Sequence, residues 1–109
     1  INTTLSNISF VKQDANYLNN LNSKDIQLYP NPATAKNFTC SFYSNADAQE
    51  LTLKVTDVMG RTISTKQVNA VKGLNIVPVS LNTNINGIHI VSLDGAGVKY
   101  NSKKIVLTY

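Results

Sequence analysis

The chain of 109 residues is long enough for one domain with a tail, and its 42% hydrophobic residues can form a core without disulfide bonds. No apolar run approaches the ~20 residues of a membrane-spanning helix. The net charge of +4 is too small and too scattered to favour nucleic-acid binding, and a single cysteine with a single histidine argues against a zinc site.

Residues 1–24 differ in composition from the rest of the chain and are expected to form a linker or the end of an upstream region. Residues 12–24 are rich in asparagine and lack helix caps and strong helix formers, which favours an extended segment. Residues 8–11 can form a strand that docks on the domain. Alternatively, residues 1–11 are the last strand of an upstream domain. The domain itself is expected to cover residues 25–109.

A Pro-Asn-Pro segment sets the start of this domain. Pro30 and Pro32 lack backbone donors, and each restricts the preceding residue, Tyr29 or Asn31, to extended conformations. A strand can therefore lead into this segment but cannot continue through the middle of a sheet. The sequence predicts a short first strand over residues 26–29, followed by a loop over residues 33–37.

Two strongly alternating strands follow. Residues 38–43 place Phe38, Cys40 and Phe42 on one face, and residues 51–57 place leucine and valine on one face and threonine and lysine on the other. A slip of one residue in the second strand would bury Lys54, so its register is strongly specified.

A hairpin signal follows at residues 57–61. Asp57 can accept a hydrogen bond from the backbone two residues on, and Gly60 can adopt the positive φ that closes such a loop. The returning strand is predicted over residues 61–68, with Ile63 as its main apolar anchor.

The remaining strands are predicted at residues 74–79, 87–93 and 103–108. Pro78 marks the first of them as an edge strand or a bulge, and the second is apolar on both faces, as in a central strand. Leu81 and Ile85 are expected to point inward from the crossover before it. About seven strands, with no convincing helix, predict an all-β, immunoglobulin-like antiparallel β-sandwich, with an open barrel as the alternative.

Catalytic and ligand-binding patterns are weak. His89, Ser92 and Asp94 are triad residue types, but His89 and Ser92 point to opposite faces of one strand. The acidic loop at residues 45–50 is a poor calcium signal, and residues 95–97 lack the third glycine and the helix of a dinucleotide site. We expect no catalytic residue, no metal and no cofactor.

Several fragments occur in an order that resembles a known family: residues 26–33, 55–61, 73–75, Leu81, 87–91 and 104–107. Together they resemble the C-terminal sorting domain of the type IX secretion system (type A, or Por secretion system) of Bacteroidetes. Two features depart from the family pattern. His89 stands where tyrosine is usual, and the tail after Lys104 lacks a final lysine.

The resemblance implies that the domain is a sorting signal, which directs the export of an upstream passenger domain in the same chain. The domain would be bound by the translocon and an outer-membrane shuttle protein, and a sortase would remove it at the cell surface. Cleavage would fall in the polar linker before the first strand, between Asn16 and Asp25. The candidate linker residues are Asn16, Leu18, Asn20, Asn22 and Ser23.

The signal itself is expected in the shared fragments and in the last strand. The candidate residues are Tyr29, Pro30, Asn31, Pro32, Asp57, Gly60, Arg61, Gly87, Lys103, Lys104, Ile105 and Val106. We hypothesise that an exposed terminal strand is captured by strand addition to a partner's sheet, with the two lysines adding charge complementarity. An edge strand can also pair two copies of the domain.

The alternative function is a non-catalytic carbohydrate-binding or adhesion module. Such modules usually present exposed tryptophans or tyrosines on a flat face, and this chain has no tryptophan. An enzyme is disfavoured, because no general acid and base can be paired from these residues.

Overall fold

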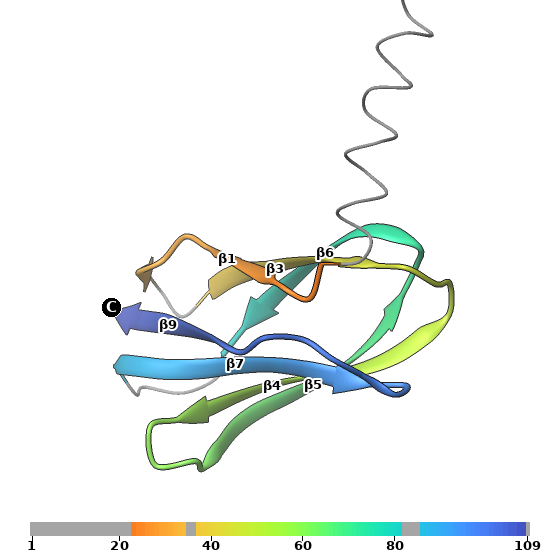
Figure 1. The fold of residues 1–109 in the computed structure, drawn as a ribbon. Helices are drawn as coiled ribbons and strands as arrows, with labels where there is room; N and C mark the ends of the chain where they lie inside the picture. Colours follow the sequence, from red (N-terminus) through yellow and green to blue (C-terminus); the bar gives the residue numbers. More distant parts are fainter. Residues whose placement is uncertain (1–22, 35–36, 82–85, 109) are drawn as a thin grey trace, which may run out of the picture.

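A computed structural model describes residues 23–34, 37–81 and 86–108, which form nine strands and no helix (Figure 1). The strands are β1 (Ile26–Tyr29), β2 (Ala33–Thr34), β3 (Asn37–Ser44), β4 (Gln49–Asp57), β5 (Thr62–Ala70), β6 (Gly73–Ser80), β7 (Gly87–Gly95), β8 (Val98–Lys99) and β9 (Lys103–Thr108).

The strands form two sheets that pack face to face (Figure 1). The smaller sheet has the order β1-β3-β6, and the larger has the order β2-β9-β7-β4-β5, with the short β8 paired to β7. The pairings are antiparallel except for that of β2 with β9, which is parallel. The predicted all-β sandwich is confirmed, whereas its immunoglobulin-like character stays a prediction.

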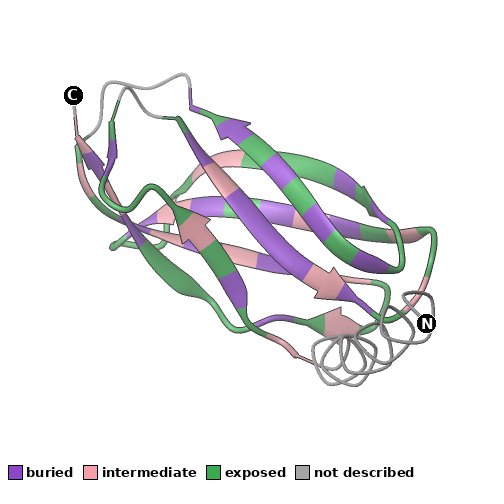
Figure 2. Cartoon of the chain, turned by 90° about the horizontal axis from the view of Figure 1, so that it is seen from above, coloured by how far each residue is buried: buried purple, intermediate pink, exposed green. Residues whose placement is uncertain are grey.

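The core follows the alternation of the strands (Figure 2). On β4, Leu51, Leu53 and Val55 are buried, and the residues between them face solvent or are half-buried. On β3, Phe38, Cys40 and Phe42 point inward as predicted. Each apolar side chain removed from water contributes about 1.5–3 kcal/mol before the cost of ordering the chain.

Three further expectations are confirmed. β6 carries Pro78 and, among the described strands, pairs with β3 alone, so it is an edge strand. β7 lies between β4 and β9, as its apolar sequence predicts. Leu81 is buried, whereas Ile85 lies outside the described residues.

Two expectations were wrong in detail. Ala33 and Thr34 belong to a strand and not to a loop, because they pair with the end of β9. Ile63 is only half-buried, and the buried anchors of β5 are Val68 and Ala70. The cause is a register shift in the β4–β5 pairing between Val55 and Thr56, which changes the alternation near the hairpin.

The sandwich has two distinct ends. At the first, which we call the linker end, the backbone N–H of Asn101 donates to the carbonyl of Lys24 at 2.7 Å, and β4 begins. At the second, the terminal end, β4 reaches Asp57, β7 begins and β9 finishes. Nine residues of β4 separate the two ends by roughly 30 Å.

Candidate recognition site

The Pro-Asn-Pro segment leaves β1 and turns onto the outer edge of β9. Pro30, Asn31 and Pro32 are exposed, and Tyr29 keeps 45% of its surface accessible. Both peptide bonds that precede the two prolines are cis. The segment passes directly into β2, which pairs with Leu107 and Thr108.

The side chain of Asn31 extends this pairing. Its Nδ2 donates to the carbonyl of Lys104 at 3.0 Å, and its Oδ1 accepts from the N–H of Val106 at 3.0 Å. In a parallel pair, a residue opposite Ile105 would make these two bonds with its own peptide groups. Because Ala33 lies opposite Leu107, position 31 is in register for that role, and the carboxamide takes the place of a backbone that prolines flank.

The outer edge of β9 is therefore occupied from Lys104 onward. Asn31 covers its first part and β2 covers the rest, with the Thr108 hydroxyl donating to the carbonyl of Ala33 at 3.3 Å. The expectation of an exposed terminal strand, free for strand addition, is wrong for this structure. The physical reason is that edge strands with unpaired peptide groups invite foreign pairing, and the chain covers this one itself.

The β4–β5 hairpin is built around the Asp57 carboxylate. Oδ1 accepts from the N–H groups of Met59 and Arg61, each at 2.9 Å, and Oδ2 accepts from Arg61 Nε at 2.8 Å. The hydrogen bond from the Arg61 backbone, followed by the Arg61 side chain, lowers the pKa of Asp57. Gly60 has φ +88°, as the hairpin prediction required.

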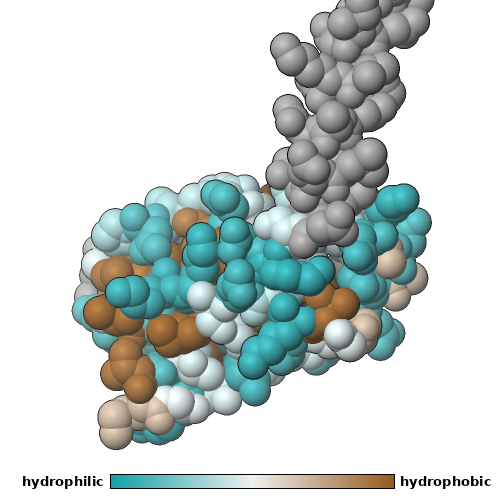
Figure 3. Space-filling view, in the orientation of Figure 1, coloured by the Kyte–Doolittle hydropathy of each residue, from teal (hydrophilic) through white to brown (hydrophobic). Residues whose placement is uncertain are grey.

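A shallow hollow of about 400 Å³ lies beside this hairpin. Its walls come from the β4–β5 hairpin and from the start of β7: Asp57, Val58, Met59 and Arg61 on one side, and Asn86, Ile88 and His89 on the other. Apolar surface gathers at this end of the molecule (Figure 3).

His89 belongs to the lining of this hollow although it is almost wholly buried. Its Nδ1 lies 3.2 Å from the carbonyl of Gly87, whereas its Nε2 has no hydrogen-bond partner among the described residues. On β7 it alternates with Ser92 as predicted: His89 points inward, and Ser92 is half-buried on the opposite face.

The four predicted signal residues of the last strand differ in exposure, and this gives them different roles. Lys103 and Lys104 are exposed, whereas Ile105 is fully buried and Val106 half-buried. Ile105 therefore acts through the core, and the lysines are accessible to a partner. Gly87, at φ +108°, begins β7 next to this strand.

The linker candidates are mostly beyond the described residues: Asn16, Leu18, Asn20 and Asn22 lie outside them. Ser23 is half-buried, and its Oγ accepts from the N–H of Asp25 at 3.2 Å. Asn101 Nδ2 donates to Asp25 at 3.0 Å, and the Lys24 ammonium lies 5.6 Å from the centroid of the Tyr100 ring. The chain is thus attached to the domain from Lys24 onward.

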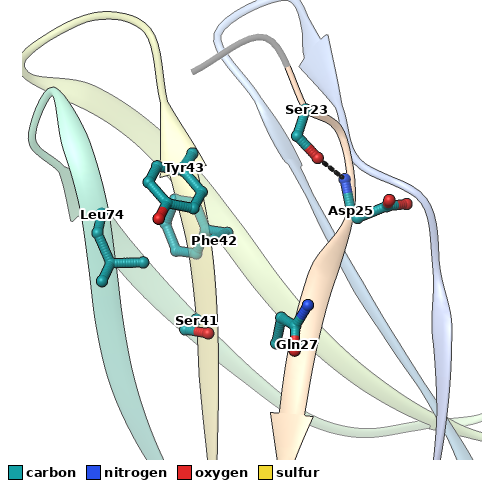
Figure 4. Close-up of a pocket in the computed structure, with 7 residues that line it drawn as sticks. All are labelled: Ser23, Asp25, Gln27, Ser41, Phe42, Tyr43 and Leu74. Carbon is teal, nitrogen blue, oxygen red and sulfur yellow. Dashed lines mark hydrogen bonds between the residues drawn. The ribbon is translucent and has the colours of Figure 1, made fainter. Parts of the chain in front are cut away.

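A second hollow lies at the linker end, over the smaller sheet (Figure 4). Its lining is Ser23, Asp25, Gln27, Ser41, Phe42, Tyr43 and Leu74. Asp25 is its only carboxylate and it contains no basic side chain, so it offers no general acid–base pair. Within the described ranges, no three His, Cys, Asp or Glu side chains gather as for a metal ion. Those ranges also contain no helix that could span a membrane.

A family model described as "Secretion system C-terminal sorting domain" matches residues 27–108, which is most of the chain. The chain belongs to the type IX C-terminal sorting domain family. No curated protein matches the sequence. The family is one of sorting signals and not of catalysts, and membership implies export of the sorting domain's passenger to the cell surface or the extracellular space.

The structure of this sorting domain brings together fragments that are distant in the sequence. Asn31, the Asp57–Arg61 loop, Gly87 and the end of β9 all lie at the terminal end. Sequence reasoning missed Val58 and Met59, which are 68% and 81% exposed. Two adjacent apolar residues inside a predicted hairpin loop are a signal that could have identified them.

Proposed function

We propose that the domain, placed at residues 25–109, is a folded address label. It directs an attached passenger through the type IX secretion system to the cell surface. The translocon and an outer-membrane shuttle protein bind it, and a sortase then cuts the chain ahead of it. In these steps the domain is a ligand and a substrate.

The observation that carries this proposal is the separation of the two ends. Most of the family fragments reach the terminal end, roughly 30 Å along β4 from Lys24, where the preceding chain attaches. The fragment at residues 73–75 is the exception, because it pairs with the end of β3 at the linker end. A machine that binds the terminal end would leave the linker accessible to a protease. This geometry supports simultaneous recognition and cleavage.

The attachment also narrows the proposed cleavage site. A protease needs several residues of extended, accessible backbone. The carbonyl of Lys24 and the side chain of Asp25 are held by Asn101, so the scissile bond should lie before Lys24. This agrees with a site in the segment from Asn16 to Ser23.

The test is a reporter fused ahead of residues 1–109 and followed to the cell surface of a type IX-competent cell. The full fusion should be displayed, and a fusion that lacks residues 103–109 should remain in the periplasm. Because the deletion removes buried Ile105 and Leu107, a core variant, Phe42→Ala, controls for lost folding. Display of the deleted fusion would contradict the terminal signal, and failure of the full fusion would contradict the function itself.

Cleavage is read from the same fusion by mass spectrometry of the released reporter. A new C-terminus between Asn16 and Ser23 is expected. A cut after Lys24, inside the hydrogen-bonded segment, would contradict the proposed position.

A further inference from the structure

The outer face of the larger sheet carries an apolar surface at the terminal end. Val58 and Met59 at the hairpin tip and Ile88 at the start of β7 are exposed, with Ile88 at 47%. Ile88 pairs across strands with Val106, and both side chains face solvent, as does half-buried Ile90. These five residues form what we call the terminal face.

The rim of the terminal face is basic. Lys104 pairs with Ile90 across strands, and Lys54 lies on the same outer face of β4. The Arg61 side chain is 77% exposed, but its Nε lies 2.8 Å from Asp57 Oδ2, so these two charges offset each other. The Asp57 carboxylate is engaged inside the hairpin. On β7, Asp94 lies six positions from Ile88, or about 20 Å away.

We propose that the terminal face is the docking surface for an acidic protein surface of the secretion machinery, one that offers apolar side chains flanked by carboxylates. This inference rests on the proposed function and adds the position and chemistry of the contact. An apolar centre with a charged rim is the usual anatomy of a protein interface. Basic groups at the rim chiefly raise the rate of encounter and select the partner.

The closed edge of β9 fixes the mode of binding. Asn31 and β2 occupy the peptide groups that strand addition would need. A partner therefore contacts the side chains of the face, with the folded domain intact. Ile88 and Val106, which project from neighbouring strands at one level, form the flat centre of that contact.

Two other occupants fit less well. A second copy docked by two-fold symmetry would bring one basic rim against the other, which is unfavourable. A membrane surface is usually recognised by clusters of four to eight basic residues. Even with Lys103 included, the rim of the terminal face has three lysines and one arginine that is paired with Asp57. A protein surface that bears both carboxylates and apolar side chains complements both the basic rim and the apolar centre of the terminal face.

The first test compares two matched pairs of exposed substitutions in the reporter fusion. Met59→Ser with Ile88→Thr removes apolar surface from the terminal face, and Ile76→Ser with Leu74→Thr removes a similar amount from the smaller sheet, where Leu74 is 48% exposed. The first pair should reduce surface display at least tenfold, and the second should leave it unchanged. Thermal unfolding of each purified domain establishes that both pairs remain folded.

The charge reversals Lys104→Glu and Lys72→Glu form the second matched pair. Lys104→Glu should reduce display, and Lys72→Glu, at the linker end, should not. If the unmodified fusion is displayed and the terminal-face variants are displayed equally well, the docking inference is overturned while the sorting function stands. If the unmodified fusion is not displayed, the proposed sorting function is contradicted, and the docking inference falls with it.

Photo-crosslinking identifies the occupant. A benzoylphenylalanine is placed at position 59 or, as a control, at position 76 of the exported chain. Crosslinks from position 59 alone, to a protein segment rich in Asp and Glu, would support the inference. Crosslinks only to lipid, only to a second copy of the domain, or equally from both positions would overturn it.

Discussion

The carboxamide of Asn31 stands in place of a peptide group beside Val106. It accepts from the Val106 N–H and donates to the carbonyl of Lys104, so that one side chain lengthens a two-residue strand. The terminal strand β9 is in this way held between β7 and a segment from the start of the same domain, formed by Asn31 and β2, which we call the strap.

Loss of the Asn31 side chain should loosen that strap. Asn31→Ala removes two hydrogen bonds at an exposed site, and we expect the free energy of unfolding to fall by about 1–2 kcal/mol. Urea unfolding gives the value, and hydrogen exchange should accelerate at the Val106 amide. Asn69→Ala, an exposed asparagine on β5, is the control and should change stability little. Equal stability of the two variants would contradict the role of the strap.

The hairpin carboxylate should make stability depend on pH. Because the pKa of Asp57 is lowered in the folded state, its contribution is present above its unfolded pKa of about 3.9 and is lost as the pH falls through the folded value. Asp57→Asn should therefore lower Tm at pH 7, and the deficit should shrink by pH 3. A deficit that is independent of pH would show that the carboxylate charge contributes nothing.

Gly95 should tolerate no side chain. A Cβ at this position would lie 2.5 Å from the Glu50 carbonyl oxygen, and its φ is +141°. Gly97, with φ +78°, has open space around the corresponding position. We expect Gly97→Ala to cost about 1 kcal/mol, for backbone strain alone. Gly95→Ala should cost clearly more in urea unfolding, and similar costs would argue against close packing of β7 on β4.

Replacement of His89 by phenylalanine should stabilise the domain. The substitution removes the buried Nε2 atom that lacks a partner, and the adjacent hollow has room for the larger ring. An unsatisfied buried polar atom costs about 1–3 kcal/mol, so a gain of about 1 kcal/mol in chemical denaturation is expected after the loss of the Nδ1 contact. A loss of stability would mean that this nitrogen is satisfied in solution.

The rate at which the Cys40 thiol is alkylated should report unfolding of the domain. Burial raises the pKa of its thiol to about 12, so the folded protein presents no thiolate near pH 8. Alkylation by iodoacetamide should be slow in the native domain and fast in urea. Since the folded pKa is raised, stability should fall as pH rises above about 9, and this slope should be smaller in Cys40→Ala. Rapid alkylation of the native domain would contradict the burial of β3.

Much of the fold could be predicted from two local features of the sequence, the alternation of apolar and polar residues and the residue types found in turns. Leu51, Leu53 and Val55 alternate with polar residues, and Asp57 with Gly60 closes a hairpin by local hydrogen bonds, so both could be predicted from neighbours along the chain. Pro78 marked an edge strand because a missing donor is a local property.

The strap and the terminal face could not be predicted in this way. Asn31 contacts Lys104 and Val106 across more than seventy residues, and no local pattern indicates which strand it will meet. Val58, Ile88 and Val106 form one surface only because the sheet order places β7 between β4 and β9. The exposed terminal strand was a wrong expectation for the same reason, since the residues that cover it, Asn31 and β2, are about seventy-five positions earlier in the sequence.

The central claim is that the secretion machinery binds the domain in its folded state. The most direct test is a disulfide bond that holds the strap to β9. Thr34 and Thr108 are paired across β2 and β9, at a strand spacing that suits a disulfide, and the periplasm is oxidising. Surface display of the reporter is measured for the double variant Thr34→Cys/Thr108→Cys and for each single variant, with and without reductant. If the machinery binds the folded domain, the oxidised double variant is displayed as well as the single variants. If its display is lost and reductant restores it, the terminal strand has to be released, and the account is contradicted.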